Sequence, residues 1–264
     1  MTVAASLVKE LRDLTGAGMM DCKRALEETG GDLEKARTLL REKGIAQAGK
    51  RAGAETKEGK VLARVDERVR GALVAVGCQT EPVANNEEFL AYAQHVLEVV
   101  WTEGPEAAGD LEEERVELVA KINENIEVRG AVRYEAGSGE VLASYIHPAA
   151  EKIGVLVRAR ASAELARQIA MHIAASGPRY VSRDDVPDDE VANERSIYEK
   201  LPEVGSKPEH IRPQIVEGML AKRFFAESTL SDQAWIHDDS KTVGQALREQ
   251  GAEVYEFVRF SLAG

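Results

Sequence analysis

Hydrophobic positions near the start of the chain recur with the period of an α-helix. Leu7, Leu11 and Leu14 are spaced i, i+4, i+7 and predict one apolar stripe, which glycines end. Similar stripes predict a second helix over residues 19–31 and a third over residues 32–44, with an aspartate as N-cap of the third. Three short helices with glycine corners predict a small bundle, in the size range of helical modules that bind peptides or proteins.

The pattern changes after the third predicted helix. The segment AQAGKRAGAETKEG, residues 46–59, has no apolar periodicity and is rich in Ala, Gly and Lys, which predicts a linker. KVLARVDE then alternates and GALVAVG is continuously apolar, so together they predict a β-hairpin. Helices are predicted next at about 86–102 and, over a highly charged stretch, at 111–124.

Strand patterns return in the middle of the chain. The stretch IEVRGAVRYEAGSGEVLASYIHPAAEKIGVLVRARA contains three of them, separated by the turn sequences AGSG and HPAAEK. An amphipathic helix follows over SAELARQIAMHIAAS, and the chain ends in a predicted helix and an alternating strand. The order strand, strand, helix thus occurs near 60–102 and again near 140–176, which predicts two related α+β subdomains.

The stretch from about 184 to 228 differs in character, because it is highly charged and its apolar positions are sparse. Two helices are predicted there with the turn PEVGSKP between them, and Pro213 should make the second helix start late or kink. Helices that bury so little need each other, so we predict an antiparallel helical hairpin, or short coiled coil, projecting from the body. The predicted fold class is α+β, with units at 1–54, 55–139 and 140–264, antiparallel sheets in the last two, and the hairpin inserted in the third.

Charge and cysteine content narrow the possible partners. The formal net charge of −12 disfavours nucleic-acid binding, because phosphate contacts need clustered Lys and Arg. The two cysteines, Cys22 and Cys78, are outside any metal-ligand spacing, which suits a reducing cytoplasm and predicts neither a zinc site nor a disulfide. The sequence has no apolar run of about 20 residues and no signal-peptide pattern at its start. We therefore expect a cytoplasmic protein that contacts neither membrane nor nucleic acid and has proteins or small cations as partners.

Motifs of the common enzyme classes are missing from the sequence, which has no GxxxxGK[ST], no GxGxxG after a strand, no HExxH and no GxSxG. The five histidines fall on separate predicted elements, and His95 and His172, on amphipathic helices, are interpreted as packed or surface side chains. His147 ends a strand just before a proline, and a functional histidine and a plain turn histidine both remain open there. These patterns favour a protein-interaction factor over an enzyme, with no metal and no cofactor.

Two stretches stand out as candidate binding elements. GCQTEPVANNEEF places a polar corner between a buried strand and an amphipathic helix, a layout found in many functional loops. TGAGMMDCK places the adjacent Met19 and Met20 at a glycine corner of the helical module, and methionine is common at protein contact surfaces. Both methionines could fill the bundle core, but we expect one to be buried and the other to be exposed for docking.

These stretches also carry a family resemblance that covers essentially the whole chain. The chain resembles the bacterial elongation factor Ts family in ordered blocks: LVKELRDLTGAGMMDCKRALEETGGDLEKARTLLREKG, CQTEPVANNEEF, SYIHPAAEKIGVLV, QIAMHIAAS, VEGML and SKTVGQALREQGAEV. The resemblance implies a guanine-nucleotide exchange factor that binds elongation factor Tu in its GDP-bound and nucleotide-free states, without binding nucleotide itself. It also implies that the N-terminal module is similar to ubiquitin-associated domains.

The resemblance further implies where the partner is contacted. The corner after the second strand would enter the partner near its Mg²⁺ and phosphate site, with residues 80–83 as the segment that displaces the ion. The N-terminal module and two other loops would touch the nucleotide domain, and a segment near residue 236 would touch a different domain. The implied contact residues are Leu11, Met19, Met20, Lys23, Gln79, Thr80, Glu81, Pro82, Val83, Ile122, Asn123, His147, Ile236 and His237.

One departure from the family pattern falls inside this corner. Where the family commonly has aspartate and phenylalanine, the chain has Glu81 and Pro82, which keep the charge but replace the aromatic ring by a rigid ring with a fixed φ. The proline could act as a stiff bump, Phe89 could supply the missing ring, or insertion could be weaker. We expect the first, because Phe89 should lie on the inner face of its helix. The alternative function is a non-catalytic scaffold whose helical module binds ubiquitin-like or peptide ligands.

Overall fold

The computed structural model of the chain describes residues 3–263, except for the side chain of Gln47. Its first half contains, in chain order, α1 (Ala5–Thr15), α2 (Met19–Glu28), α3 (Leu33–Arg51), β1 (Glu58–Asp66), β2 (Arg70–Cys78), α4 (Glu81–Ala84), α5 (Glu87–Glu103), η1 (Pro105–Leu111), α6 (Glu112–Ile122) and β3 (Ile126–Glu135). Its second half contains β4 (Val141–Ile146), β5 (Ile153–Arg160), α7 (Ala163–Ser176), η2 (Arg183–Asp185), α8 (Asp188–Glu199), α9 (Pro202–Gly205), η3 (Glu209–Ile211), α10 (Arg212–Met219), η4 (Leu220–Phe225), α11 (Ala226–Ser228), η5 (Leu230–Asp232), β6 (Ala234–Trp235), β7 (Asp238–Thr242), α12 (Val243–Glu249) and β8 (Glu253–Ser261).

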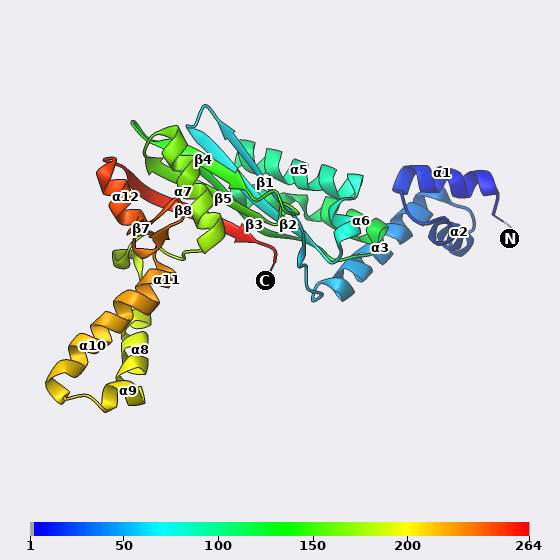
Figure 1. Cartoon of the computed structure of the whole chain (residues 1–264). Helices are drawn as coiled ribbons and strands as arrows, with labels where there is room; N and C mark the ends of the chain where they lie inside the picture. Colours follow the sequence, from blue (N-terminus) through cyan, green and yellow to red (C-terminus); the bar gives the residue numbers. More distant parts are fainter. Residues whose placement is uncertain (1–2, 264) are drawn as a thin grey trace.

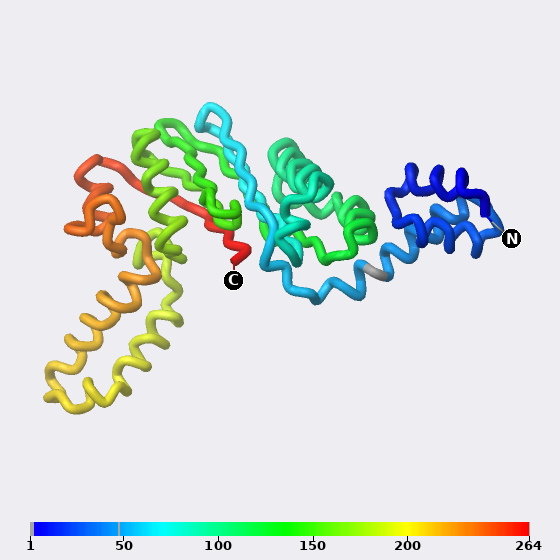
Figure 2. The backbone as a smooth tube through the Cα atoms, turned by 45° about the vertical axis from the view of Figure 1, so that its right-hand side comes forward, coloured from blue at the N-terminus to red at the C-terminus, as the bar shows by residue number. Residues whose placement is uncertain are grey.

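The molecule is elongated, with three parts in a row (Figure 1). The helices α1, α2 and α3 form a small module at one end, and the strands with α5, α6 and α7 form a body in the middle. A helical hairpin that includes α8 and α10 projects from the other end. Figure 2 shows α3 running from the module to the body. The combination of separate helices with small antiparallel sheets confirms the predicted α+β class.

The N-terminal module has an apolar core of its own, in which Leu11 and Leu26 are fully buried. The first helix ends at Gly16, whose φ of 65° is the left-handed conformation that glycine adopts without strain. Asp32 caps α3, because its carboxylate accepts a hydrogen bond from the backbone N–H of Lys35 at 3.0 Å. The three predicted helices and the predicted cap are thus confirmed.

The predicted end of the third helix was wrong. Instead of stopping at Gly44, α3 continues to Arg51, so the first part of the segment interpreted as a linker is helical. The reason is close packing against α6: a Cβ added at Gly44 would lie 2.9 Å from the Cβ of Ala120. Ala48, one turn further on, is buried with the core of the body. Small residues that suggested a flexible linker therefore permit close contact between two helices.

The body is built from two three-stranded antiparallel sheets, with strand orders β1-β2-β3 and β4-β5-β8. They pack against each other through an apolar layer that includes Leu73 and Leu156. The contact is close, since a Cβ added at Gly154 would lie 2.4 Å from a methyl carbon of Val61. Helices α5 and α7 cover the two outer faces. The central strand β2 is therefore buried on both faces, which explains its continuously apolar pattern.

The predicted recurrence of strand, strand and helix is confirmed. In each half a central strand, β2 or β5, leads into the helix that covers the outer face of its sheet. A later strand, β3 or β8, then pairs with the free side of the central strand. The sequence patterns also predicted the strands β3 and β8, but not their pairing with the central strands, because each of them follows after further helices.

The segment from α8 to α11 folds as the predicted antiparallel helical hairpin (Figure 1). A small cluster that includes Val204, Val216 and Leu220 holds its two arms together. Pro213 lies in the first turn of α10, so the predicted late start of this helix is confirmed. The pattern missed the small hairpin of β6 and β7, because β6 has only two residues and β7 is charged and mostly exposed.

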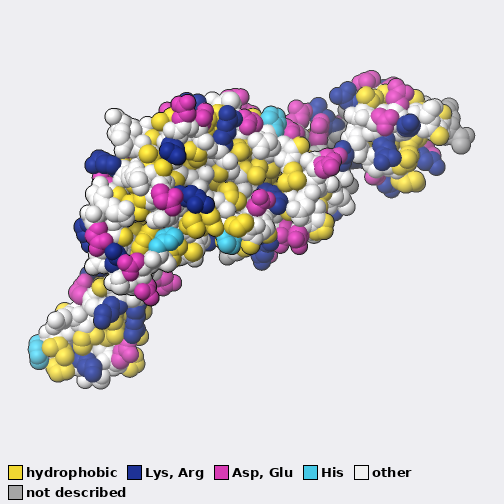
Figure 3. All heavy atoms as spheres, turned by 45° about the horizontal axis from the view of Figure 1, so that its top comes forward, with side chains coloured by type: hydrophobic (Ala, Val, Ile, Leu, Met, Phe, Trp, Pro, Cys, Tyr) yellow, Lys and Arg dark blue, Asp and Glu magenta, His cyan; other side chains and the backbone are white. Residues whose placement is uncertain are grey.

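Acidic and basic side chains are intermixed on the face shown in Figure 3, with apolar side chains between them. On this face of the body, side chains of one charge do not form a continuous patch. Among residues 3–263, no helix combines the length and the apolar character that crossing a membrane would need.

Candidate functional site

The corner that follows β2 is a helical turn. The four-residue helix α4 stands between the end of β2 and the start of α5. Pro82 lies in its first turn, where the missing N–H of proline costs little because that group would have no helical acceptor. Glu81 and Pro82 are exposed, whereas Ala84 is buried and Val83 packs against the core under α5. The corner therefore has a packed base and a solvent-facing tip.

The base of the corner is tied to the loop that follows α6. The Glu124 carboxylate accepts hydrogen bonds from the backbone N–H groups of Gln79 and Thr80, at 3.2 and 3.0 Å. It also accepts one from the Thr80 hydroxyl, at 2.6 Å. The side-chain oxygen of Gln79 in turn accepts from the backbone N–H of Asn125 at 2.9 Å. Two segments that are far apart in sequence thus hold each other.

The same loop binds the end of α3. Asn123 has a left-handed φ of 65° at the end of α6, and its side-chain oxygen accepts a hydrogen bond from Arg51 at 2.8 Å. Asn125 is buried, and its side-chain amide donates to the carbonyl oxygen of Ala54 at 2.8 Å. Sequence reasoning missed the parts played by Arg51, Asn125 and the intervening glutamate, because a polar NEN run after a helix resembles an ordinary helix end.

The Cys78 thiol is buried at the start of the corner and donates a hydrogen bond to the carbonyl oxygen of Thr80 at 3.3 Å. Burial, together with the negative charge of Glu124, raises the pKa of Cys78 to about 12. The thiol therefore stays protonated at neutral pH and is a poor nucleophile. Its part in the corner is packing and hydrogen bonding.

His147 lies in the turn between β4 and β5 and is exposed. Its ring nitrogen Nδ1 lies 3.3 Å from the hydroxyl of Tyr145. The turn is tied to β1 by an ion pair between Lys152 and Glu58 at 2.5 Å, and Glu58 lies opposite Cys78 in the β1–β2 ladder. His147 is therefore placed at the end of the body that also carries the corner.

Three of the implied contact segments thus lie at one end of the body: the corner 79–83, the pair Ile122 and Asn123, and His147. Of these, Ile122 is half-buried against the core under α5, whereas Asn123 and His147 are exposed. The other implied residues lie on the N-terminal module and on the turn between β6 and β7. They form separate surfaces.

On the N-terminal module, the expectation of one buried and one exposed methionine was wrong. Met19 and Met20 are 50% and 61% exposed, because they begin α2 while Cys22 and later residues supply its inner face. Lys23 is also exposed, with Glu27 3.9 Å away. Leu11 is 0% exposed, so it cannot touch a partner of the folded module and supports the contact surface from within.

The turn between β6 and β7 presents Ile236 and His237 to solvent. Behind it lies the buried His172, whose Nε2 is 2.9 Å from the side-chain oxygen of Gln233. The Nδ1 atom of His172 accepts a hydrogen bond from the backbone N–H of Ile236 at 3.4 Å. Burial lowers the pKa of His172, which favours the neutral ring that can accept this bond. The interpretation of His172 as a packed histidine is confirmed, and its contact with Ile236 was missed.

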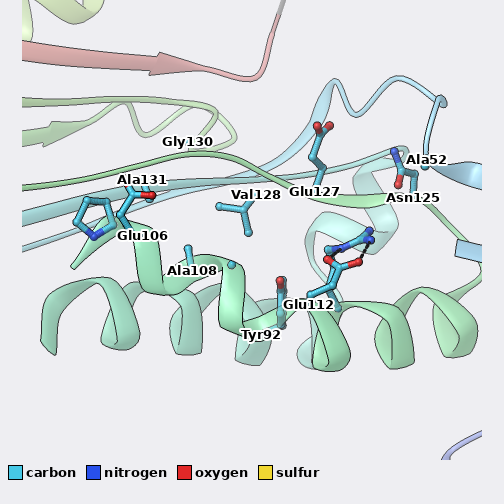
Figure 4. A pocket seen from close by; sticks show the side chains of 13 residues that line it. Ala52, Tyr92, Glu106, Ala108, Glu112, Asn125, Glu127, Val128, Gly130 and Ala131 are labelled. Atoms are coloured by element: carbon cyan, nitrogen blue, oxygen red, sulfur yellow. Dashed lines mark hydrogen bonds and ion pairs between the residues drawn. The ribbon is translucent and has the colours of Figure 1, made fainter. Parts of the chain in front are cut away.

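Two cavities lie elsewhere in the molecule. One of about 550 Å³ lies between β3 and the helices α5, η1 and α6, with Tyr92, Glu112 and Glu127 on its walls (Figure 4). The other, of about 750 Å³, lies between the N-terminal module and α6 and includes Leu14 and Ile45. The described residues that line these cavities include none of the implied contact residues. The candidate site is therefore a set of protruding surfaces.

Comparison with known proteins gives the family. The family model described as elongation factor TS matches residues 79–264. A protein named elongation factor Ts from Shewanella amazonensis is 46% identical over 266 residues, covering 99% of this chain and 91% of the relative. Its namesake from Alkalilimnicola ehrlichii is 42% identical over 274 residues, covering 99% and 92%, and that from Erwinia tasmaniensis is 43% identical over 265 residues, covering 98% and 91%. The resemblance seen in the sequence is thus confirmed, and this chain belongs to the elongation factor Ts family of translation elongation factors.

Proposed function

We propose that the chain is a guanine-nucleotide exchange factor for elongation factor Tu, binding that GTPase in its GDP-bound and nucleotide-free states. The observation that carries this proposal is the preformed corner 79–83, whose packed base leaves Glu81 and Pro82 in solvent. Together with the family membership, this shape supports a role as a probe that enters the partner near its Mg²⁺ and phosphate site and favours GDP release.

The proposed activity rests on linkage between two binding events. Mg²⁺ and the phosphates of GDP hold each other in a GTPase site. A factor that binds best to the state without them must weaken nucleotide binding by the same coupling free energy. No bond is made or broken on the factor itself. It therefore needs no cofactor, nucleophile or general base, and in this sense it is not an enzyme.

The corner can act as a stiff bump in place of an aromatic wedge. Pro82 fixes its own φ within the first turn of α4, and Val83 and Ala84 hold the turn against the body. Phe89 is 0% exposed at the start of α5, so it would have to leave the core to replace the missing ring. These facts support the first of the three alternatives for the Glu81 and Pro82 departure.

We further propose that each unit of the chain carries one docking surface. In the unit 1–54 it is the exposed face around Met19, Met20 and Lys23. In the unit 55–139 it is the corner. In the unit 140–264 it is the turn of Ile236 and His237, while His147 of the same unit lies beside the corner. Linked contacts raise the effective concentration of one another. Docking through several surfaces would therefore let the corner enter the partner even if the corner itself contributes little to the affinity.

The test is release of a fluorescent GDP from elongation factor Tu, followed by stopped flow. The chain should accelerate release, and Pro82→Gly should slow the accelerated rate several-fold, because glycine loosens the turn. Pro82→Phe should be tolerated. Pro105→Gly, the same change in the first turn of η1 at the far end of α5, is a matched control and should have no effect on the rate. No acceleration by the wild-type chain would refute the proposed function, and unchanged rates for Pro82→Gly combined with Glu81→Ala would remove the corner from the mechanism.

A further inference from the structure

The corner cannot hold its shape by local interactions alone. Its helix α4 has four residues, too few for a stable isolated helix. Thr80 stands at the N-cap position, where a threonine hydroxyl usually accepts a hydrogen bond from a backbone N–H of the first turn. Here the hydroxyl donates to Glu124 instead, and the side chain makes no capping bond. A hydrogen bond to the distant Glu124 thus replaces the local cap.

The Glu124 carboxylate takes over the task of fixing the corner. Three donors of the corner converge on it: the backbone N–H groups of Gln79 and Thr80 and the Thr80 hydroxyl, at distances of 2.6 to 3.2 Å. Hydrogen bonds to an ionised carboxylate are stronger than neutral ones. Both residues immediately before the protruding tip are therefore held by one side chain.

The backbone of Glu124 is fixed by contacts of the residues before and after it. Its neighbour Asn123 caps α6 with a backbone hydrogen bond to Val119 O and accepts a hydrogen bond from Arg51. Its other neighbour, Asn125, is buried and bonded to Ala54. The carboxylate thus projects from a backbone that is anchored to α6 and to the end of α3.

We propose that Glu124 is the positioning residue of the exchange reaction: it fixes the direction and height of the Glu81 and Pro82 tip and acts through the corner. This inference rests on the proposed function. Without Glu124, part of the binding free energy would go into ordering a loose loop, and less of it would favour insertion of the tip into the partner. Loss of Glu124 should therefore lower the maximal rate of GDP release more than it weakens docking, which the other surfaces maintain.

The test compares Glu124→Ala and Glu124→Gln with Glu135→Ala. Glu135 is an exposed glutamate at the opposite end of the β2–β3 ladder, paired with Arg70 at 3.0 Å, and so serves as the matched control. In the free protein, amide hydrogen exchange at Gln79 and Thr80 should rise about tenfold or more in Glu124→Ala, since both amides lose their acceptor. In stopped flow, the maximal rate should fall about tenfold, while the half-saturating factor concentration changes less than about threefold.

Glu124→Gln keeps one acceptor oxygen and should give an intermediate rise in hydrogen exchange and an intermediate fall in the maximal rate, whereas Glu135→Ala should change neither. If hydrogen exchange at the corner stays as in the wild type, Glu124 is not its anchor and the proposal fails. It also fails if hydrogen exchange rises but the maximal rate does not fall. If only the half-saturating concentration rises, Glu124 is a docking contact and the proposal fails as well.

A wild-type chain that does not accelerate GDP release would instead refute the proposed function, while the hydrogen-exchange result would still decide whether Glu124 holds the corner. Thermal unfolding of each variant checks that it is folded, and the milder Gln variant keeps the test decisive if the Ala variant is not.

Discussion

The two halves of the body connect their central strand to the covering helix in different ways. In the second half, Ala161 and Ser162 suffice to lead the chain from β5 into α7. In the first half, the equivalent connection from β2 to α5 takes residues 79–86 and contains α4. Both helices then cover the outer face of their sheet in the same manner. The second half therefore shows that a helix can cover its sheet in this manner after a two-residue connection, and we expect the extra residues of the first connection to serve binding.

The two connections also differ in what stabilises them. Ser162 caps α7 locally, because its hydroxyl accepts a hydrogen bond from the backbone N–H of Leu165 at 3.2 Å. In the longer connection, the hydroxyl of Thr80 reaches to Glu124 on a remote loop. A turn that the fold requires is encoded by its own residues, whereas the added corner depends on partners that lie far away in sequence.

Replacing residues 79–86 by the Ala-Ser pair of the second half is the strongest way to break this comparison. We expect a folded protein that no longer accelerates GDP release, so that the rate returns to the intrinsic rate of the partner. Circular dichroism and thermal unfolding check the fold, and stopped flow gives the rate. A folded variant that still accelerates release would show that the corner does not act on the partner. An unfolded variant would show that the fold does need the corner, and the comparison would not hold.

Truncating the matched core positions tests whether the two helices are packed equally well. Phe89 and Leu165 are each the third residue of their helix, and both are buried. Phe89→Ala should lower the free energy of unfolding by about 3–5 kcal/mol and Leu165→Ala by about 2–5 kcal/mol. Urea unfolding followed by tryptophan fluorescence measures both, since Trp101 and Trp235 lie in different halves.

The same position also tests the wedge alternative. Phe89→Leu keeps an apolar core side chain and should leave GDP release within about twofold of wild type, because this side chain stays in the core. A folded Phe89→Leu variant with a large loss of rate would mean that Phe89 supplies the missing ring. A loss of stability below about 1 kcal/mol in Phe89→Ala would contradict its place in the core.

The caps of the two helices give a smaller contrast. The side-chain oxygen of Asn86 accepts hydrogen bonds from the backbone N–H groups of both Glu88 and Phe89, at 2.9 and 3.3 Å, whereas Ser162 accepts only one. Asn86→Ala should therefore cost about 1–2 kcal/mol and Ser162→Ala about 0.5–1 kcal/mol of stability. Urea unfolding of the two variants checks the order, and a larger loss for Ser162→Ala would contradict it.

How far the sequence predicts this molecule depends on the range of each interaction. The apolar run of β2, the cap at Asp32 and the late start at Pro213 are local signals, and all three were predicted. The course of α3 beyond Gly44 was not, because the small residues suggested flexibility until their contact with Ala120 was known. Periodicity within one segment cannot reveal a partner in another.

The candidate site follows the same rule. The resemblance named the exposed residues of the corner, and the polar run between a strand and a helix already marked it as unusual. Neither the resemblance nor the polar run indicated Glu124. Its hydrogen bonds to Gln79 and Thr80 join residues that several helices separate in the sequence. The resemblance also named Leu11 as a contact residue, although Leu11 belongs to the apolar stripe of its helix and the structure buries it completely.

The smallest expected effect concerns His172 on α7, which is buried, whereas His95 on α5 is exposed. Burial lowers the pKa of His172 below its ordinary value of 6.5, so below that pH the unfolded chain binds a proton more readily than the folded one. The stability it contributes is present above about pH 6.5 and is lost as the pH falls, with a slope of at most about 1.4 kcal/mol per pH unit. Urea unfolding at about pH 7.5 and about pH 5.5 should show a smaller loss in His172→Gln than in wild type. An equal loss in His172→Gln and in wild type would mean that burial of His172 does not set the pH dependence.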